Sequence, residues 1–216
     1  TNIKLNKFLD AGFEKQTSTE VTALPTEKEN DAEPESAYAN VITGIDTDDN
    51  IAQEGDTHYV YLTFDSEPGE NTDLILDALA EKGIKATFFV DGDASGENEA
   101  VYKRIVDEGH TIGMHSYCNQ YSTIYSSTDA FSSDYLQIHD YIYDVTGVDS
   151  KFYRFPGGSS NEISNVNMAE FVSILNQNDV AYFDWNVSAG DASSDYTVED
   201  IVSNVTEGVA KYKTSV

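Results

Sequence analysis

Two short segments place ionisable side chains where they could do chemistry. YLTFDSEPGENT (residues 61–72) brings the Asp65 carboxylate directly after an apolar strand, and GMHSYCNQY (residues 113–121) brings the His115 imidazole after another. A carboxylate at a strand end can serve as a general base, a metal ligand or a helix-capping group. A lone histidine is more often a structural hydrogen-bonding residue than a ligand. The two segments therefore predict either the two halves of a metal site or the remains of one.

A third segment, YRFPGGSSN (residues 153–161), adds a cation and two adjacent glycines. Arg154 stands just before the Phe-Pro pair that ends a predicted strand, and it could pair with Asp65 and keep that carboxylate ionised. Gly157 and Gly158 would let the backbone approach a ligand closely. We therefore expect this segment to share a site with Asp65.

A fourth segment, FDWNVSAGDAS (residues 183–193), holds two carboxylates and the only tryptophan of the chain. Asp184 and Asp191 follow a predicted strand. Trp185 is either a wall against which a sugar ring packs or an aromatic residue of the core, and both interpretations stay open.

Apolar patterns predict how the chain positions these segments. Short strands are expected at residues 58–64, 85–90, 110–114, 151–155 and 180–185. Helices are expected at residues 71–83, 98–109, 131–145, 166–177 and 197–212. Repeated strand–helix units predict a parallel sheet or an α/β barrel, in which chemistry is found at the C-terminal ends of the strands. The functional candidates Asp65, His115, Arg154 and Asp184 to Asp191 all fall at or just after such an end.

The composition narrows the classes of partner. The chain has 216 residues and a formal net charge of −27, which disfavours binding to nucleic acid or to anionic lipid. No apolar run approaches the ~18 residues of a membrane span, and one cysteine, Cys118, permits no intrachain disulfide. Residues 14–40 are polar and acidic, as in a linker. We expect residues 1–57 to form an arm with a short strand, and residues 58–216 to form the folded domain.

The four segments together resemble the NodB-homology polysaccharide deacetylases, which are carbohydrate esterase family 4. TFDSEP is similar to the first motif of that family, HSYCN to the second, RFPGGSSN to the third and DWNVSAGDA to the fourth, over residues 58–213. The resemblance implies a distorted (β/α) barrel and a divalent metal, often zinc. It also implies removal of acetyl groups from a glycan such as peptidoglycan, a chitin-like polymer or xylan.

The resemblance also implies roles for individual residues. Asp65 matches the general base, Arg154 the residue that orients this base, and His115 the first histidine ligand of the metal. Asp191 matches the acidic residue that tunes the catalytic acid. The positions that match a substrate-binding surface are Tyr153, Pro156, Gly157 and Trp185.

The metal ligands depart from the family pattern. Ser66 stands where the family has an aspartate ligand, and Asn119 stands where it has the second histidine, so only His115 is retained. A hydroxyl and an amide are poor ligands for zinc, which prefers imidazole, thiolate or carboxylate. Glu67 or Cys118 could supply a replacement ligand.

Two functions therefore remain open at this point. The chain is either a metal-dependent deacetylase with unusual ligands or a catalytically inactive glycan-binding or scaffold module of the cell surface. The fifth motif of the family, a Leu-x-His segment with the catalytic acid, has no match and would follow Val216. Because the first residue is Thr1, we expect an upstream segment such as a signal peptide or an anchor. An extracellular or bacterial cell-surface location is expected for either function.

Overall fold

The computed structural model describes residues 50–216. Its strands are β1 (Tyr59–Val60), β2 (Thr63–Ser66), β3 (Thr87–Asp91), β4 (Thr111–Ser116), β5 (Phe152–Tyr153), β6 (Ala181–Tyr182) and β7 (Thr214–Ser215). Its helices are α3 (Glu70–Lys82), α4 (Glu99–Asp107), α5 (Tyr121–Ile124), α6 (Thr128–Thr146), α7 (Met168–Gln177) and α8 (Val198–Lys211). The chain thus alternates strands and helices, as the apolar pattern predicts.

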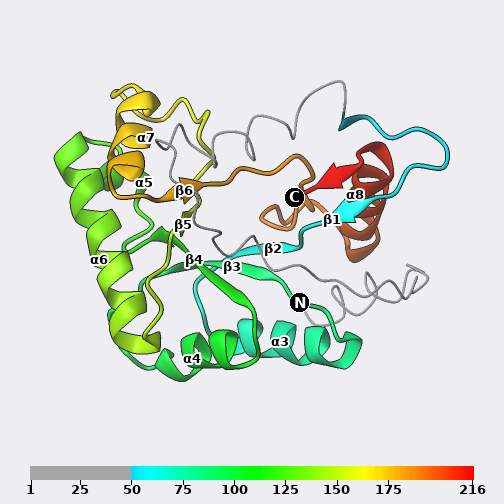
Figure 1. Cartoon of the computed structure of the whole chain (residues 1–216), viewed down its shortest axis with the longest axis horizontal. Coiled ribbons are helices and arrows are strands. Elements are labelled where there is room, and N and C mark those ends of the chain that lie inside the picture. Colours follow the sequence, from blue (N-terminus) through cyan, green and yellow to red (C-terminus); the bar gives the residue numbers. More distant parts are fainter. Residues whose placement is uncertain (1–49) are drawn as a thin grey trace, which may run out of the picture.

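A five-stranded parallel sheet forms the centre of the fold. Its strand order is β2-β3-β4-β5-β6, and every neighbouring pair is parallel. Figure 1 shows α3 and α4 side by side below the sheet, α6 along its left side, and α8 on the opposite side next to β1. The α/β architecture expected from the sequence is confirmed. Because the strands are parallel, all their C-terminal ends meet at one edge.

The predicted strand over residues 58–64 is in fact two strands in two sheets. Its first part, β1, pairs in parallel with β7, whereas its second part, β2, pairs with β3. The segment before β1 joins the same region, because Ile51 bridges to Tyr212 and the Asn50 amide donates to the Thr214 carbonyl. Residues 50–60 therefore lie against the end of α8 and the strand that follows it.

The strand predicted at residues 151–155 is shorter than expected. Only Phe152 and Tyr153 pair as β5, and the chain leaves the sheet at Arg154. Pro156 has no N–H to donate, and Gly157 has a φ of 78°, which turns the backbone away from the sheet. The early end of β5 leaves Arg154 at the edge of the sheet rather than within it.

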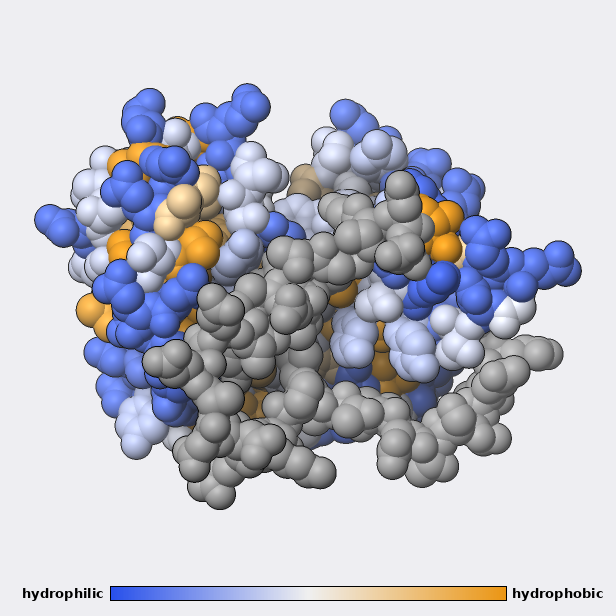
Figure 2. Space-filling model, turned by 45° about the horizontal axis from the view of Figure 1, so that its top comes forward, coloured by the Kyte–Doolittle hydropathy of each residue, from blue (hydrophilic) through white to orange (hydrophobic). Residues whose placement is uncertain are grey.

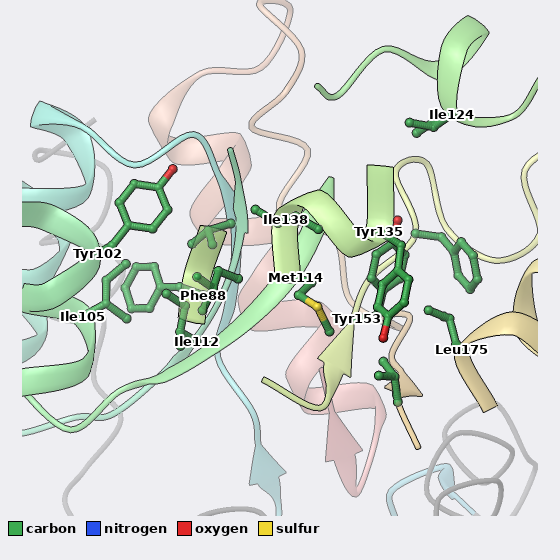
Figure 3. Packing of buried hydrophobic residues seen from close by; sticks show 14 of the residues in the cluster. Phe88, Tyr102, Ile105, Ile112, Met114, Ile124, Tyr135, Ile138, Tyr153 and Leu175 are labelled. Atoms are coloured by element: carbon green, nitrogen blue, oxygen red, sulfur yellow. The ribbon is translucent and has the colours of Figure 1, made fainter. Parts of the chain in front are cut away.

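Aromatic and aliphatic side chains from α4, α6, α7 and the sheet form the main core. Phe131 on α6 packs against Tyr153, Phe155 and Phe171, with ring centroids 4.7–5.7 Å apart. Figure 3 shows Tyr135 beside Tyr153 of β5, and Met114 lies on the neighbouring strand β4. This core fixes α6 against β4 and β5, which carry His115 and lead into Arg154.

The surface is predominantly polar, in keeping with the net charge of −27. On the face shown in Figure 2, hydrophilic side chains line the periphery and the hydrophobic ones are scattered between them. An ion-pair cluster joins α3 to α4, where Arg104 donates to the carboxylates of Asp73, Asp77 and Glu108. Arg104 thus joins the two helices.

We predict that Ile138→Ala lowers the free energy of unfolding by about 2–5 kcal/mol, because it leaves a cavity in the core. Ile138 on α6 is 0% exposed. Leu136→Ala on the same helix is the matched control. Leu136 is 48% exposed, so its truncation should change stability by no more than about 0.5 kcal/mol. Urea denaturation of both variants measures the difference, and equal losses would contradict the packing described here.

We also predict that an ion pair at the end of α6 makes stability depend on pH. Burial alone would lower the pKa of His139, but hydrogen bonds to Asp149 and Asp140 outweigh burial and raise the pKa. The stabilisation is therefore complete below the unfolded pKa of about 6.5 and is lost as the pH rises through the raised folded value. The difference in urea midpoint between the wild type and His139→Gln should shrink from pH 6 to pH 9. A constant difference would be the contrary result.

Candidate functional site

Arg154 is the central cation of the strand edge. It is 2% exposed, and its Nη1 donates to Asp65 Oδ1 over 2.9 Å and to Thr63 Oγ1 over 2.8 Å. Its Nε and Nη2 donate to the backbone carbonyls of Phe183 and Asp184. The predicted ion pair of Arg154 with Asp65 is therefore present. The same guanidinium joins β2 to the segment that follows β6.

The Arg154 guanidinium also lies between two aromatic rings. Its Cζ is 4.3 Å from the centroid of the Phe89 ring and 5.5 Å from that of Trp185. Burial lowers the pKa of Arg154, and the charges of Asp65 and Asp184 oppose this effect. Because an arginine stays protonated in proteins, the site contains a permanent buried cation.

Asp65 has one oxygen bound and the other facing His115. Its side chain is 35% exposed, and its Oδ2 lies 4.0 Å from His115 Nε2. A carboxylate with one oxygen engaged by an arginine and the other open can accept a proton from water. The two residues that the sequence singled out first therefore meet at one point of the sheet edge.

A carboxylate that the sequence analysis missed, Asp91, lies on the other side of His115. Asp91 Oδ1 is 2.8 Å from His115 Nδ1, and Asp91 Oδ2 accepts a hydrogen bond of 2.9 Å from the Asn119 amide. Asp91 is the last residue of β3. Its sequence signal was the same as that of Asp65, a carboxylate at the C-terminal end of an apolar strand.

The loop after β4 is held by a second buried carboxylate, Asp134 on α6. Asp134 accepts hydrogen bonds from Ser116 Oγ and from the backbone N–H groups of Tyr117 and Cys118. The Ser116 hydroxyl oxygen in turn accepts from the backbone N–H of Asn119. Four residues of the HSYCN segment are thereby fixed, and Asn119 is held with a φ of 47°.

The third and fourth segments form one wall of the site. Trp185 is 38% exposed and lies beside Gly158, where a built Cβ would come within 3.5 Å of its ring. A side chain at Gly157 would meet the ring of Tyr121 at 3.1 Å. The interpretation of Trp185 as a surface residue next to the site is therefore favoured over a place in the core.

Two residues that were expected to contact substrate are buried. Tyr153 is 0% exposed and packs in the core against Phe131 and Tyr135, so it does not line the site (Figure 3). Pro156 is also buried, and its carbonyl accepts a hydrogen bond from the Tyr125 hydroxyl. Their physical role is to fix the backbone on which Arg154 and Gly157 stand.

Asp191 makes no contact with Asp65, His115 or Arg154. It is exposed and has no hydrogen bond or ion pair with another residue of the described range 50–216. Asp184 is the carboxylate of this segment that is tied to the site. It accepts from the backbone N–H and the hydroxyl of Ser159, while its own carbonyl binds Arg154.

The side chains present do not fit the metal that the family resemblance implies. Within residues 50–216, no three His, Cys, Asp or Glu side chains are grouped so that they could hold an ion. Ser66 Oγ is buried and has no partner in that range, and the Asn119 amide is engaged with Asp91. Glu67 is exposed and completes no such group. Burial raises the pKa of Cys118, which disfavours the thiolate that zinc needs.

Comparison with known proteins identifies the class of the chain. A family model described as polysaccharide deacetylase matches residues 52–183, and the parallel sheet agrees with the folds of solved members of carbohydrate esterase family 4. This chain belongs to the polysaccharide deacetylase family. The family resemblance seen in the four motifs is therefore confirmed, and so is the α/β fold that it implied.

Individual relatives connect the family to the bacterial cell wall. The catalytic domain of a peptidoglycan N-acetylglucosamine deacetylase from Eubacterium rectale is 37% identical, with a TM-score of 0.70 and 77% of each chain covered. A putative polysaccharide deacetylase of Bacillus subtilis, YheN, is 30% identical over 61% of this chain and 45% of its own length. The peptidoglycan-N-acetylglucosamine deacetylase PgdA of Listeria monocytogenes is 34% identical over 48% of this chain and 22% of its own length.

The chain thus spans less than half the length of these two curated relatives. Deacetylases of this family generally depend on a metal, which makes the altered ligand positions of this chain notable. None of the helices between residues 50 and 216 has the length and hydrophobicity of a membrane span.

We predict that Arg154→Lys lowers the free energy of unfolding by about 2–4 kcal/mol. A lysine has one ammonium and cannot reach Asp65, Thr63 and two carbonyls at once, so buried acceptors lose their donor. Arg104→Lys, at the partly exposed ion-pair cluster, is the matched control and should cost under about 1 kcal/mol. Chemical denaturation of both variants provides the comparison, and a small effect at Arg154 would refute its structural importance.

Proposed function

We propose that this domain acts on or binds an acetylated glycan of the bacterial cell wall, at the sheet edge that carries Asp65, His115 and Arg154. The observation that carries the proposal is the Arg154–Asp65 ion pair, which leaves Asp65 Oδ2 open beside His115. Peptidoglycan is the polymer that the names of the relatives support best. Chitin-like and xylan-like polymers are the alternative substrates.

The residues of this chain supply a base and a binding wall. In hydrolysis of an acetyl amide, water adds to the carbonyl carbon, the C–N bond breaks, and acetate and a free amine are formed. Asp65 Oδ2 would take the proton from the attacking water, while Arg154 holds Oδ1 of the same carboxylate in place. The exposed ring of Trp185 would lie against a sugar. An outward-facing location, extracellular or at the bacterial surface, follows from this substrate.

The second candidate function is glycan binding without hydrolysis. It is favoured by a specific observation, namely that Ser66 and Asn119 stand at ligand positions and that the Asn119 amide is bound to Asp91. A domain of this kind would keep the wall and the ion pair of the pocket and would serve as a recognition or scaffold module. Residues 1–49 of the expected arm lie outside the described residues, and residues 50–57 lie against α8 and β7 of the domain.

We predict that Asp65→Asn lowers acetate release from peptidoglycan by at least about 10²-fold, because the amide cannot accept the proton of the water. Glu70→Gln, which removes an exposed carboxylate at the start of α3, is the control and should leave the rate unchanged. Acetate release and glycan affinity are measured on the same samples, with peptidoglycan, chitin oligosaccharides and acetylated xylan as separate substrates.

The outcomes separate the two functions. Release by the native protein that depends on Asp65 supports hydrolysis. Binding without release, together with release gained by the double variant Ser66→Asp/Asn119→His in the presence of Zn²⁺, supports a binding module. Neither binding nor release on any of the three polymers would overturn the proposal.

A further inference from the structure

The Asp91 carboxylate is shared between two donors of the pocket. Because an ionised carboxylate only accepts hydrogen bonds, the 2.8 Å contact to Asp91 Oδ1 requires that His115 Nδ1 carries a proton. The Asn119 amide nitrogen donates to Oδ2 over 2.9 Å. One oxygen therefore serves each donor. The ring of His115 is held with its Nε2 turned toward Asp65.

The backbone around Asp91 is itself fixed on both sides. The buried Tyr102 hydroxyl donates to the Asp91 carbonyl over 2.6 Å, and the Gly92 N–H donates to the Ser116 carbonyl over 3.0 Å. A side chain at Gly92 has no room, because a built Cβ would lie 2.4 Å from the ring of Tyr117. Asp91 therefore cannot move away from His115 without breaking contacts on β3, α4 and β4.

The pairing of β3 with β4 directs the two side chains together. The register runs Val90 to Met114 and then Asp91 to Ser116, so His115 is the extra residue of β4 at this point. Such a shift re-aims the side chains next to it. It places the imidazole within hydrogen-bond distance of Asp91. With regular pairing, successive side chains of β4 would simply have continued to alternate between the two faces of the sheet.

We propose that Asp91 is the positioning residue of this pocket, which holds the His115 imidazole and the Asn119 amide in place with no metal ion between them. In a three-ligand metal site, the ion itself would connect the side chains at positions 66, 115 and 119. Here the carboxylate of Asp91 joins His115 to Asn119 and thus organises both ends of the HSYCN segment. Asp91 would position His115 and Asn119 in the same way whether the domain hydrolyses the glycan or only binds it.

The hydrogen-bond directions make the proposal testable by exchange of two side chains. In Asp91→Asn, one oxygen remains for two donors, and the new amide N–H₂ faces a donor. In the double variant Asp91→Asn/Asn119→Asp, the amide introduced at position 91 would accept from His115 and donate to the carboxylate introduced at position 119. Each group then regains a partner. The exchange keeps the composition and the charge of the native protein, and an aspartate side chain tolerates the positive φ of position 119.

The experiment measures the melting temperature and the His115 ring nitrogens by ¹⁵N NMR, in EDTA, with His115→Gln to assign the signals. In the native protein we expect a protonated Nδ1, unchanged by EDTA. Asp91→Asn should lose this signature and melt roughly 4–8 °C lower. The exchanged double variant should regain the signature of a protonated Nδ1. It should also recover at least half of the melting temperature lost in Asp91→Asn. Asn119→Asp alone completes the cycle and should also melt lower.

Asp93→Asn is the control that separates positioning from stability. Asp93 is buried two residues away and accepts from Ser95, Gly96 and Asn98, none of which touches His115. Its replacement should lower the melting temperature and leave the His115 signature intact. The proposal is overturned if Asp91→Asn keeps the signature, if the exchange restores neither readout, or if EDTA removes the signature from the native protein.

Discussion

The burial of one guanidinium constrains everything at the working edge of this fold. Arg154 is nearly inaccessible to water, so each of its N–H groups needs an acceptor, and the chain supplies them from β2 and from the segment after β6. These two parts of the sheet are not neighbours in the strand order. The arginine therefore sets the distance across the sheet edge. It also holds Oδ1 of Asp65 in a hydrogen bond at this edge.

The second half of the pocket is organised by carboxylates that face inward. Asp134 gathers three donors of the loop after β4, and Asp91 gathers two more from His115 and Asn119. A metal ion would supply positive charge and draw carboxylates to itself, whereas here the protein's own N–H and O–H groups satisfy them. The family fold is retained, and within residues 50–216 hydrogen bonds from the protein itself satisfy these two carboxylates.

The sequence predicted where along the chain the site residues lie, but it predicted less well which way their side chains point. The strand ends that carry Asp65, His115 and Arg154 follow from apolar patterning alone, as does the Arg154–Asp65 pair. Asp91 had the same local signal as Asp65 and was overlooked, but its contact with His115 could not be predicted, because it depends on the register shift between β3 and β4. The break between β1 and β2 was missed because the apolar run from Tyr59 to Leu62 continues through it. The burial of Tyr153 could not be predicted, because a motif position does not reveal on which face of a strand a side chain lies.

The pairing of β1 with β7 has a consequence for how the molecule is made. Asn50 and Thr214, which bond to each other in this region, are 164 residues apart in sequence. Contacts of such separation cannot form until the ribosome has released the later partner, and they slow folding because a long loop must close. The sheet from β2 to β6 needs only residues between them and can assemble earlier. We therefore expect the nascent chain to form the sheet edge with Asp65, His115 and Arg154 before β1 is docked, with β1 exposed to chaperones in the interval.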